Sequence, residues 1–84
     1  MIWFIEFTDY VVGLVNTLCA NGMIENPLEC KKAAKQLNNE FWGEEEVSDY
    51  PGGCYVYNST KVYFNQNFAG VKHEESQPIC SQGN

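Results

Sequence analysis

The spacing of four cysteines is the feature that most constrains this chain. Cys19, Cys30, Cys54 and Cys80 are spread over 84 residues, and an even number of separated cysteines in a short chain is typical of two disulfides. A domain of this length has a thin core and gains much from such crosslinks. The alternatives are free buried thiols or a zinc site, but zinc ligands normally come in close C-x(2–4)-C pairs, and the sequence has no such pair and one histidine, His73. We therefore expect disulfides in an oxidising compartment, secreted, organelle-lumenal or virion-exposed, and not in the reducing cytosol.

The charge balance argues against polyanionic partners. Five lysines and no arginine stand against eleven acidic residues, which gives a net charge of −6. Binding to nucleic acid or to an anionic membrane needs a concentrated positive surface. The apolar N-terminal run is interrupted by Glu6 and Asp9 and is too short for a membrane span. We expect a chain that does not itself span a membrane.

Two helices are predicted in the N-terminal half. The first covers roughly residues 8–20, with Thr8 as its cap and apolar residues at helical intervals: Val11, Leu14, Val15 and Leu18. The second begins at Asn26-Pro27, since asparagine is a good cap and proline suits the first helical position. Its buried stripe is formed by Cys30, Ala33, Ala34, Leu37 and Phe41.

The C-terminal half favours strands. After an acidic connector at 43–53, two short runs rich in aromatic and β-branched residues, 54–58 and 61–65, flank Asn58-Ser59-Thr60 and predict a hairpin. The tail from residue 66 is expected to be loop-like until Ile79-Cys80. The predicted fold class is α+β, with two N-terminal helices packed on a small antiparallel hairpin or sheet and stapled by two disulfides.

Catalytic and metal-binding signals are weak, so we expect no enzyme, no cofactor and no metal. His73 lies in a glutamate-rich stretch, which favours a solvated surface histidine over a catalytic one. The Glu44-Glu45-Glu46 run lacks the pattern of a calcium loop and is interpreted as solvated. Asn58-Ser59-Thr60 is an N-glycosylation sequon, although asparagine and serine are also ordinary turn residues.

Aromatic residues offer the strongest binding signal. In the predicted hairpin, Tyr55 and Tyr57 lie on the face opposite Cys54 and Val56. With Trp42 they could form an amphipathic platform for a sugar ring or a protein, because tyrosine supplies contact area at low entropic cost. The alternative is that these rings pack in the core.

Several segments together resemble a small cysteine module of uncharacterised proteins from marine microalgae, dinoflagellates and large algal viruses. The matching segments are Cys30-Lys-Lys-Ala-Ala-Lys-Gln-Leu37, Tyr50-Pro-Gly-Gly-Cys-Tyr55, Val62-Tyr-Phe-Asn65, Gly70 and Pro78-Ile-Cys80. The resemblance covers residues 19–80, and Asn38 stands where the pattern usually has glycine.

The resemblance implies an extracytoplasmic disulfide module without catalytic activity. It makes Cys30, Cys54 and Cys80 framework residues, with Cys19 as the fourth. Within this module we prefer the pairs Cys30–Cys54 and Cys19–Cys80, although the sequence itself allows three connectivities. Residues 19–84 would then form the module, and residues 1–18 an apolar attachment segment that leads into the first helix.

Two functional hypotheses follow from these observations. The first is a non-enzymatic accessory or structural subunit that docks into a larger assembly, such as the lumenal face of a photosynthetic complex, a virion or an extracellular fibre. Its docking residues would be apolar ones at the N-terminus: Ile2, Trp3, Phe4 and Phe7. The second is a free-standing, lectin-like recognition module that binds a protein or a glycan through Tyr55, Tyr57 and Trp42. A secreted inhibitor or toxin-like effector is a third reading, based on size and cysteine content alone.

Overall fold

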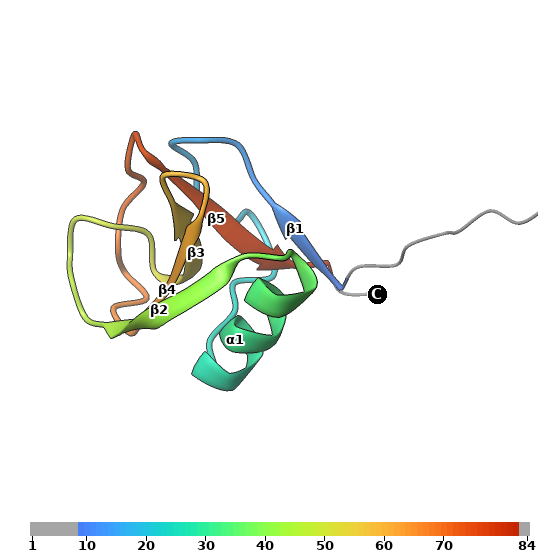
Figure 1. Cartoon of the computed structure of the whole chain (residues 1–84). Coiled ribbons are helices and arrows are strands. Elements are labelled where there is room, and N and C mark those ends of the chain that lie inside the picture. The colour runs from blue at the N-terminus through green and yellow to red at the C-terminus, as the bar shows by residue number, and fades with distance from the viewer. Residues whose placement is uncertain (1–8, 83–84) are drawn as a thin grey trace, which may run out of the picture.

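A computed structural model describes residues 9–82, and its main element is a five-stranded mixed sheet (Figure 1). The strands and the helix are β1 (Tyr10–Val12), α1 (Pro27–Gln36), β2 (Glu40–Glu45), β3 (Gly53–Tyr57), β4 (Lys61–Asn65) and β5 (Ser76–Ser81). The strand order is β1-β5-β3-β4-β2, and β2 runs parallel to β4 while all other neighbours are antiparallel. The predicted architecture of two helices on a small hairpin is therefore wrong.

The first predicted helix is replaced by the edge strand β1 and an irregular loop. β1 pairs with β5, and the pairing continues where the Gly13 and Asn16 amides donate to the Pro78 and Ser76 carbonyls at 2.8 and 3.0 Å. Asn16 has a φ of 65°, a left-handed conformation that interrupts a right-handed helix. The helical spacing of apolar residues was misleading, because most of these side chains are exposed; Leu14 is 78% exposed.

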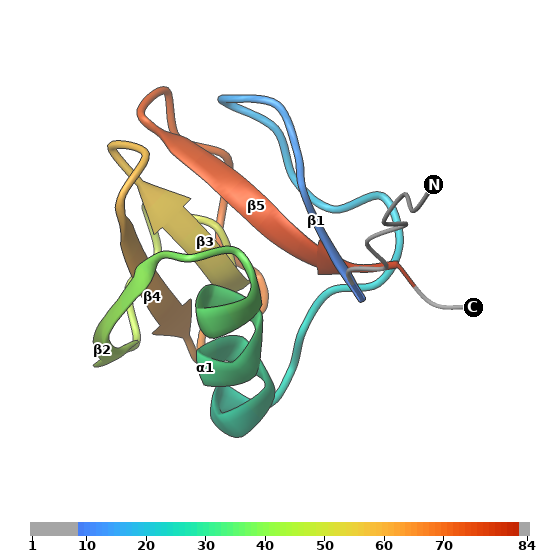
Figure 2. The same cartoon turned by 45° about the vertical axis from the view of Figure 1, so that its right-hand side comes forward.

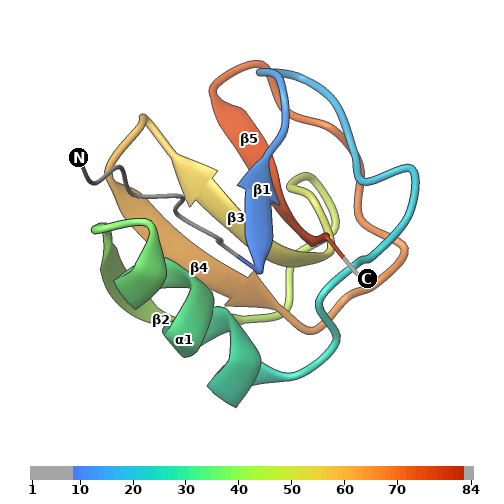
Figure 3. The ribbon, with the colours of Figure 1, turned by 90° about the vertical axis from the view of Figure 1, so that its right-hand side faces the viewer.

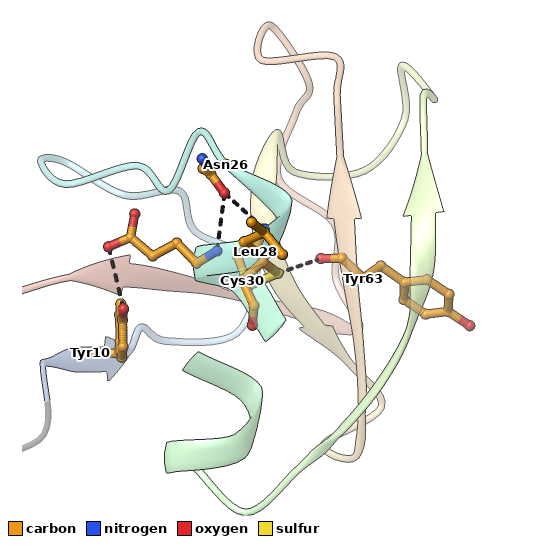
Figure 4. The surroundings of a disulfide bond; sticks show 7 residues. Tyr10, Asn26, Leu28, Cys30 and Tyr63 are labelled. Carbon is orange, nitrogen blue, oxygen red and sulfur yellow. Dashed lines mark hydrogen bonds between the residues drawn. A yellow bond between two sulfur atoms is a disulfide. The ribbon is translucent and has the colours of Figure 1, made fainter. Parts of the chain in front are cut away.

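The second predicted helix is present as α1, and its start follows the local sequence. The Asn26 side chain accepts hydrogen bonds from the Leu28 and Glu29 amides at 2.8 and 3.2 Å, and Pro27 occupies the first turn (Figure 4). The helix ends before Asn38, which has a φ of 61°. Capping of this kind satisfies amides that have no partner inside the helix.

The core lies between α1 and one face of the sheet (Figure 2). Its buried residues are Tyr10, Ile24, Cys30, Ala33, Ala34, Cys54, Val56, Val62, Phe64 and Ile79. The small alanines let the helix approach the sheet closely. Because only one face is covered by a helix, the other face of the central strands is left to its own side chains and to loops.

The hairpin of β3 and β4 is confirmed, and two further strands extend it. Asn58 and Ser59 take left-handed conformations in its turn, with φ values of 53° and 71°. β2 and β5 flank this hairpin (Figure 3). Phe41, which was expected on the buried stripe of the second helix, belongs instead to β2, and this strand ends within the expected acidic connector. β5 lies in the expected loop-like tail. Both strands gain their hydrogen bonds from partners distant in the sequence, which local pattern does not reveal.

Two disulfides join the N-terminal half of the chain to the C-terminal half. Cys30–Cys54 links α1 to β3 in the core, and Cys19–Cys80 links the loop after β1 to β5. The Cys30 sulfur also lies 3.5 Å from the Tyr63 carbonyl oxygen, while the Tyr63 ring points away from it (Figure 4). These crosslinks are those expected of an oxidising compartment.

Candidate functional site

The face of the hairpin opposite α1 is covered by tyrosines. Side chains alternate between the faces of a strand, so Tyr55 and Tyr57 of β3 lie opposite the buried Cys54 and Val56. Tyr55 is the cross-strand neighbour of Tyr63 in β4, and their rings stack with centroids 5.7 Å apart. Stacked aromatic pairs across strands stabilise a sheet face beyond simple burial.

Two loops bring further rings onto this face. Tyr50, from the connector between β2 and β3, stacks on Tyr55 at 5.7 Å and meets Tyr57 edge-on at 6.0 Å. His73, from the connector between β4 and β5, stacks on Tyr50 at 4.2 Å. The two loops are bonded to each other, since the Val71 amide donates to the Tyr50 carbonyl at 3.0 Å.

Asn65 fixes the loop that carries Tyr50. Its side chain is fully buried at the end of β4. The amide nitrogen donates to the carbonyls of Val47, Tyr50 and Pro51 at 2.9–3.3 Å, and the amide oxygen accepts from the Val47 and Asn67 amides at 3.0 and 3.1 Å. A buried polar group with this many partners holds the adjoining backbone in one arrangement.

Together these elements form an open pocket of about 260 Å³, which we call the tyrosine pocket. It is lined by Glu45, Tyr50, Tyr55, Tyr57 and Tyr63. Glu45 comes from β2, whose parallel pairing places it beside Asn65. The volume suits a single side-chain group or a small ring better than an extended ligand, since pockets for drug-sized molecules are larger.

Two of the phenol groups are hydrogen-bonded to carboxylates. The Tyr55 hydroxyl donates to Glu45 Oε2, and the Tyr57 hydroxyl donates to Glu75 Oε1 at 3.1 Å. Burial, followed by the bond to Glu45, raises the pKa of Tyr55 well above its ordinary value, and the bond to Glu75 raises the pKa of Tyr57. Both phenols therefore stay neutral at physiological pH.

The backbone amide of Glu75 donates to Nδ1 of His73 at 3.0 Å. Nδ1 is thus an acceptor here, and the neutral ring carries its proton on Nε2. The imidazole stacks on the Tyr50 ring, whereas the sequence predicted a solvated surface histidine.

Trp42 lies at the margin of the same face. It occupies an irregularity in β2, between the paired residues Phe41 and Gly43, and is 53% exposed. Its ring lies 6.5 Å from that of Tyr63, and the Lys61 Nζ is 5.0 Å from its centroid. The margin therefore already holds an ammonium group over an aromatic ring.

The residues proposed from sequence as an interaction surface have different positions. Tyr55 is 2% exposed at the base of the tyrosine pocket, Tyr57 is half-buried in its wall, and Trp42 is exposed beside it. The sequon residue Asn58 is exposed at the hairpin turn. The proposed docking residues Ile2, Trp3, Phe4 and Phe7 lie outside the described residues.

Sequence reasoning missed Glu45, Tyr50 and Tyr63 as pocket residues, and it placed His73 in solvent. Tyr63 could have been found, because a turn at Asn58-Ser59-Thr60 sets Tyr55 opposite Tyr63. Glu45 had no local signal that distinguished it from the acidic residues on either side.

Within residues 9–82, no cluster of three or more histidine, cysteine or acidic side chains is placed to hold a metal ion. In the same part of the chain, the helix is too short to cross a bilayer.

Comparisons with family models, curated proteins and solved structures gave no match to this chain. The resemblance to the small cysteine module therefore rests on the sequence pattern alone.

Proposed function

We propose that this protein is a non-catalytic recognition module of an oxidising compartment, and that the tyrosine pocket is its ligand site. The observation that carries the proposal is the concentration of four tyrosines and one glutamate around a single open pocket in so small a domain. Tyrosine combines a rigid apolar surface with a hydroxyl group, which suits recognition of small polar groups.

The construction of the pocket supports a binding role. Stacking and Asn65 hold its rings before any ligand arrives, so little conformational entropy is lost on binding. A core that needed these rings only for stability would bury them, whereas Tyr50, Tyr57 and Tyr63 remain partly exposed.

The test is a binding screen on the full oxidised chain with a glycan array and a set of small polar compounds. Binders are expected to shift the tyrosine ring resonances, and Tyr57→Ala is expected to abolish their binding. Phe68→Ala is the matched control, because Phe68 is an exposed aromatic residue that packs against Phe64, outside the tyrosine pocket. Binding that survives Tyr57→Ala unchanged would contradict the proposed site.

A second candidate is the accessory subunit that docks into a larger assembly through its N-terminal segment. It is favoured by a run of exposed apolar side chains directly after β1: Leu14, Val15 and Leu18. Exposed apolar surface of this kind is typical of protein contacts. Deletion of residues 1–7 combined with Leu14→Ser and Leu18→Ser should then abolish co-purification with larger proteins while the domain stays folded, and unchanged co-purification would reject this role.

A further inference from the structure

We propose that the tyrosine pocket selects an organic cation with N–H donors, that is, a guanidinium or a primary ammonium group. This inference rests on the proposed function, whose ligand it specifies. It follows from the hydrogen bonds already made by the pocket, from the nature of its lining and from the charge of the chain.

The hydrogen bonds already made in the pocket decide which atoms two of its phenols offer to a ligand. A phenol has one proton to donate, and the protons of Tyr55 and Tyr57 are directed to the carboxylates of Glu45 and Glu75. These hydroxyls therefore present only their lone pairs to a ligand. With the carboxylate of Glu45, they make the pocket rich in acceptors, and acceptors bind N–H or O–H donors.

The charge of the pocket lining also favours a cation. The residues that line the pocket are four tyrosines and Glu45, so the described lining carries a negative charge and no positive one. The faces of tyrosine rings attract cations, and charge-assisted bonds to a carboxylate are roughly twice as strong as neutral ones. A neutral sugar would gain from the rings and the acceptors but not from the charge.

The margin of the pocket holds a contact between an ammonium group and an aromatic ring. Lys61 belongs to the same face of β4 as Tyr63, and its ammonium group lies over Trp42. The chain thus uses one of its own five lysines in the type of contact that we propose for the ligand. Substitution of Lys61 can also distinguish the charge of the ligand, because its ammonium group repels a cationic ligand and attracts an anionic one.

A guanidinium group fits these features particularly well. It is planar and stacks on aromatic rings, and its N–H groups can reach a carboxylate and a phenol oxygen together. The pocket volume of about 260 Å³ accommodates one such group with part of its alkyl stem. The two natural sources are an arginine or lysine side chain of a protein and a free amine, and the chemistry is the same for both.

The experiment compares a blocked arginine tripeptide with the same peptide carrying citrulline, which has the same shape without the charge. Binding to the full oxidised chain is measured by calorimetry and by shifts of the tyrosine ring resonances. We expect the arginine peptide to bind about tenfold more tightly than the citrulline peptide. Agmatine and butylamine form a second arm: affinities equal to that of the peptide indicate a free amine as the source, and much weaker ones indicate a protein.

Two variants with equal charge provide the matched control. Glu45→Gln removes the carboxylate in the pocket and keeps an oxygen that can accept a hydrogen bond from the Tyr55 hydroxyl. Glu44→Gln removes the charge of the neighbouring residue, whose carboxylate lies outside the pocket and accepts a hydrogen bond from the Gln66 side chain. Affinity for the arginine peptide should fall about tenfold in the first variant and less than about twofold in the second. Lys61→Gln should leave the affinity unchanged or increase it.

The outcomes separate this inference from the proposed function. Equal affinity for arginine and citrulline peptides, equal effects of the two glutamate variants, or a loss of affinity in Lys61→Gln would overturn the cation assignment. If a neutral sugar then bound at the tyrosine pocket, the recognition module would stand with a different ligand. If the cations shifted no tyrosine ring resonance and no glycan on the array bound the domain, both proposals would be rejected.

Discussion

Replacement of the buried disulfide by serines should harm the fold more than replacement of the outer one, although the buried disulfide closes the shorter loop. Cys30 and Cys54 are 24 residues apart and Cys19 and Cys80 are 61 apart. Loop entropy alone then gives about 3.5 kcal/mol for the first crosslink and about 4.3 kcal/mol for the second. Burial reverses this order, because Cys30 and Cys54 are 0% and 1% exposed.

The serine pair at Cys30 and Cys54 places two hydroxyls in the core, at a cost of about 2 kcal/mol each. The total of about 7.5 kcal/mol approaches the full stability of a small domain, and this variant should be largely unfolded. The alanine pair at the same positions avoids the buried hydroxyls and should lose only about 5 kcal/mol, including a small cavity term.

Urea unfolding followed by tryptophan fluorescence measures these differences, with circular dichroism for any variant that is unfolded in buffer. At Cys19 and Cys80 the serine and alanine pairs should differ by no more than about 2 kcal/mol, since Cys19 is partly exposed and only the hydroxyl at Cys80, which is 8% exposed, would be buried. Equal stability of the serine and alanine pairs at Cys30 and Cys54 would refute the argument from burial.

Three further predictions concern single substitutions at Tyr55, Asn65 and Ser76. Because folding raises the pKa of Tyr55 above that of an unfolded tyrosine, the contribution of Tyr55 to the free energy of unfolding should be constant to about pH 9 and fall above about pH 10. Tyr55→Phe should reduce this alkaline loss of stability, and an unchanged slope in alkaline urea titrations would contradict the prediction. Asn65→Asp should destabilise by about 3 kcal/mol, because a carboxylate would face three carbonyls, and the Tyr50 ring resonances should broaden. Retention of wild-type stability would contradict the role of Asn65 in holding the loop that carries Tyr50. The Ser76 hydroxyl is buried with no hydrogen-bond partner among residues 9–82, so Ser76→Ala should be neutral or stabilising by about 1 kcal/mol in thermal unfolding, whereas a clear loss would indicate a partner.

The elements predicted correctly from the sequence are those that neighbouring residues specify on their own. Asn26 and Pro27 specify the start of α1 through their own side chains, independently of the rest of the chain. Asn58 and Ser59 adopt left-handed conformations, which short polar residues tolerate better than most, and this turn sets the register of the β3–β4 hairpin. Three of the four tyrosines of the tyrosine pocket, Tyr55, Tyr57 and Tyr63, follow from that register alone.

The elements that sequence missed depend on distant partners. Val11 and Val12 suit a strand or a helix, and the choice is made by β5, nearly seventy residues further along, as the pairing of Val11 with Cys80 shows. Which of the consecutive glutamates reaches the pocket depends on the irregularity at Trp42, which shifts the register of β2 against β4. A shift of one residue in a strand exchanges its two faces, so Glu45 could not be selected from Glu44-Glu45-Glu46 by pattern.

The pairing of β1 with β5 has a practical consequence for handling the domain. The Gln82 amide donates to the Asp9 carbonyl at 2.9 Å, so both ends of the described chain leave the sheet side by side. They leave from the edge strand β1 and its neighbour β5, whereas Trp42 and Glu45 belong to β2 at the opposite edge. A surface tether, a reporter or a host loop into which the domain is inserted can therefore be attached at either end while the tyrosine pocket stays open to solution.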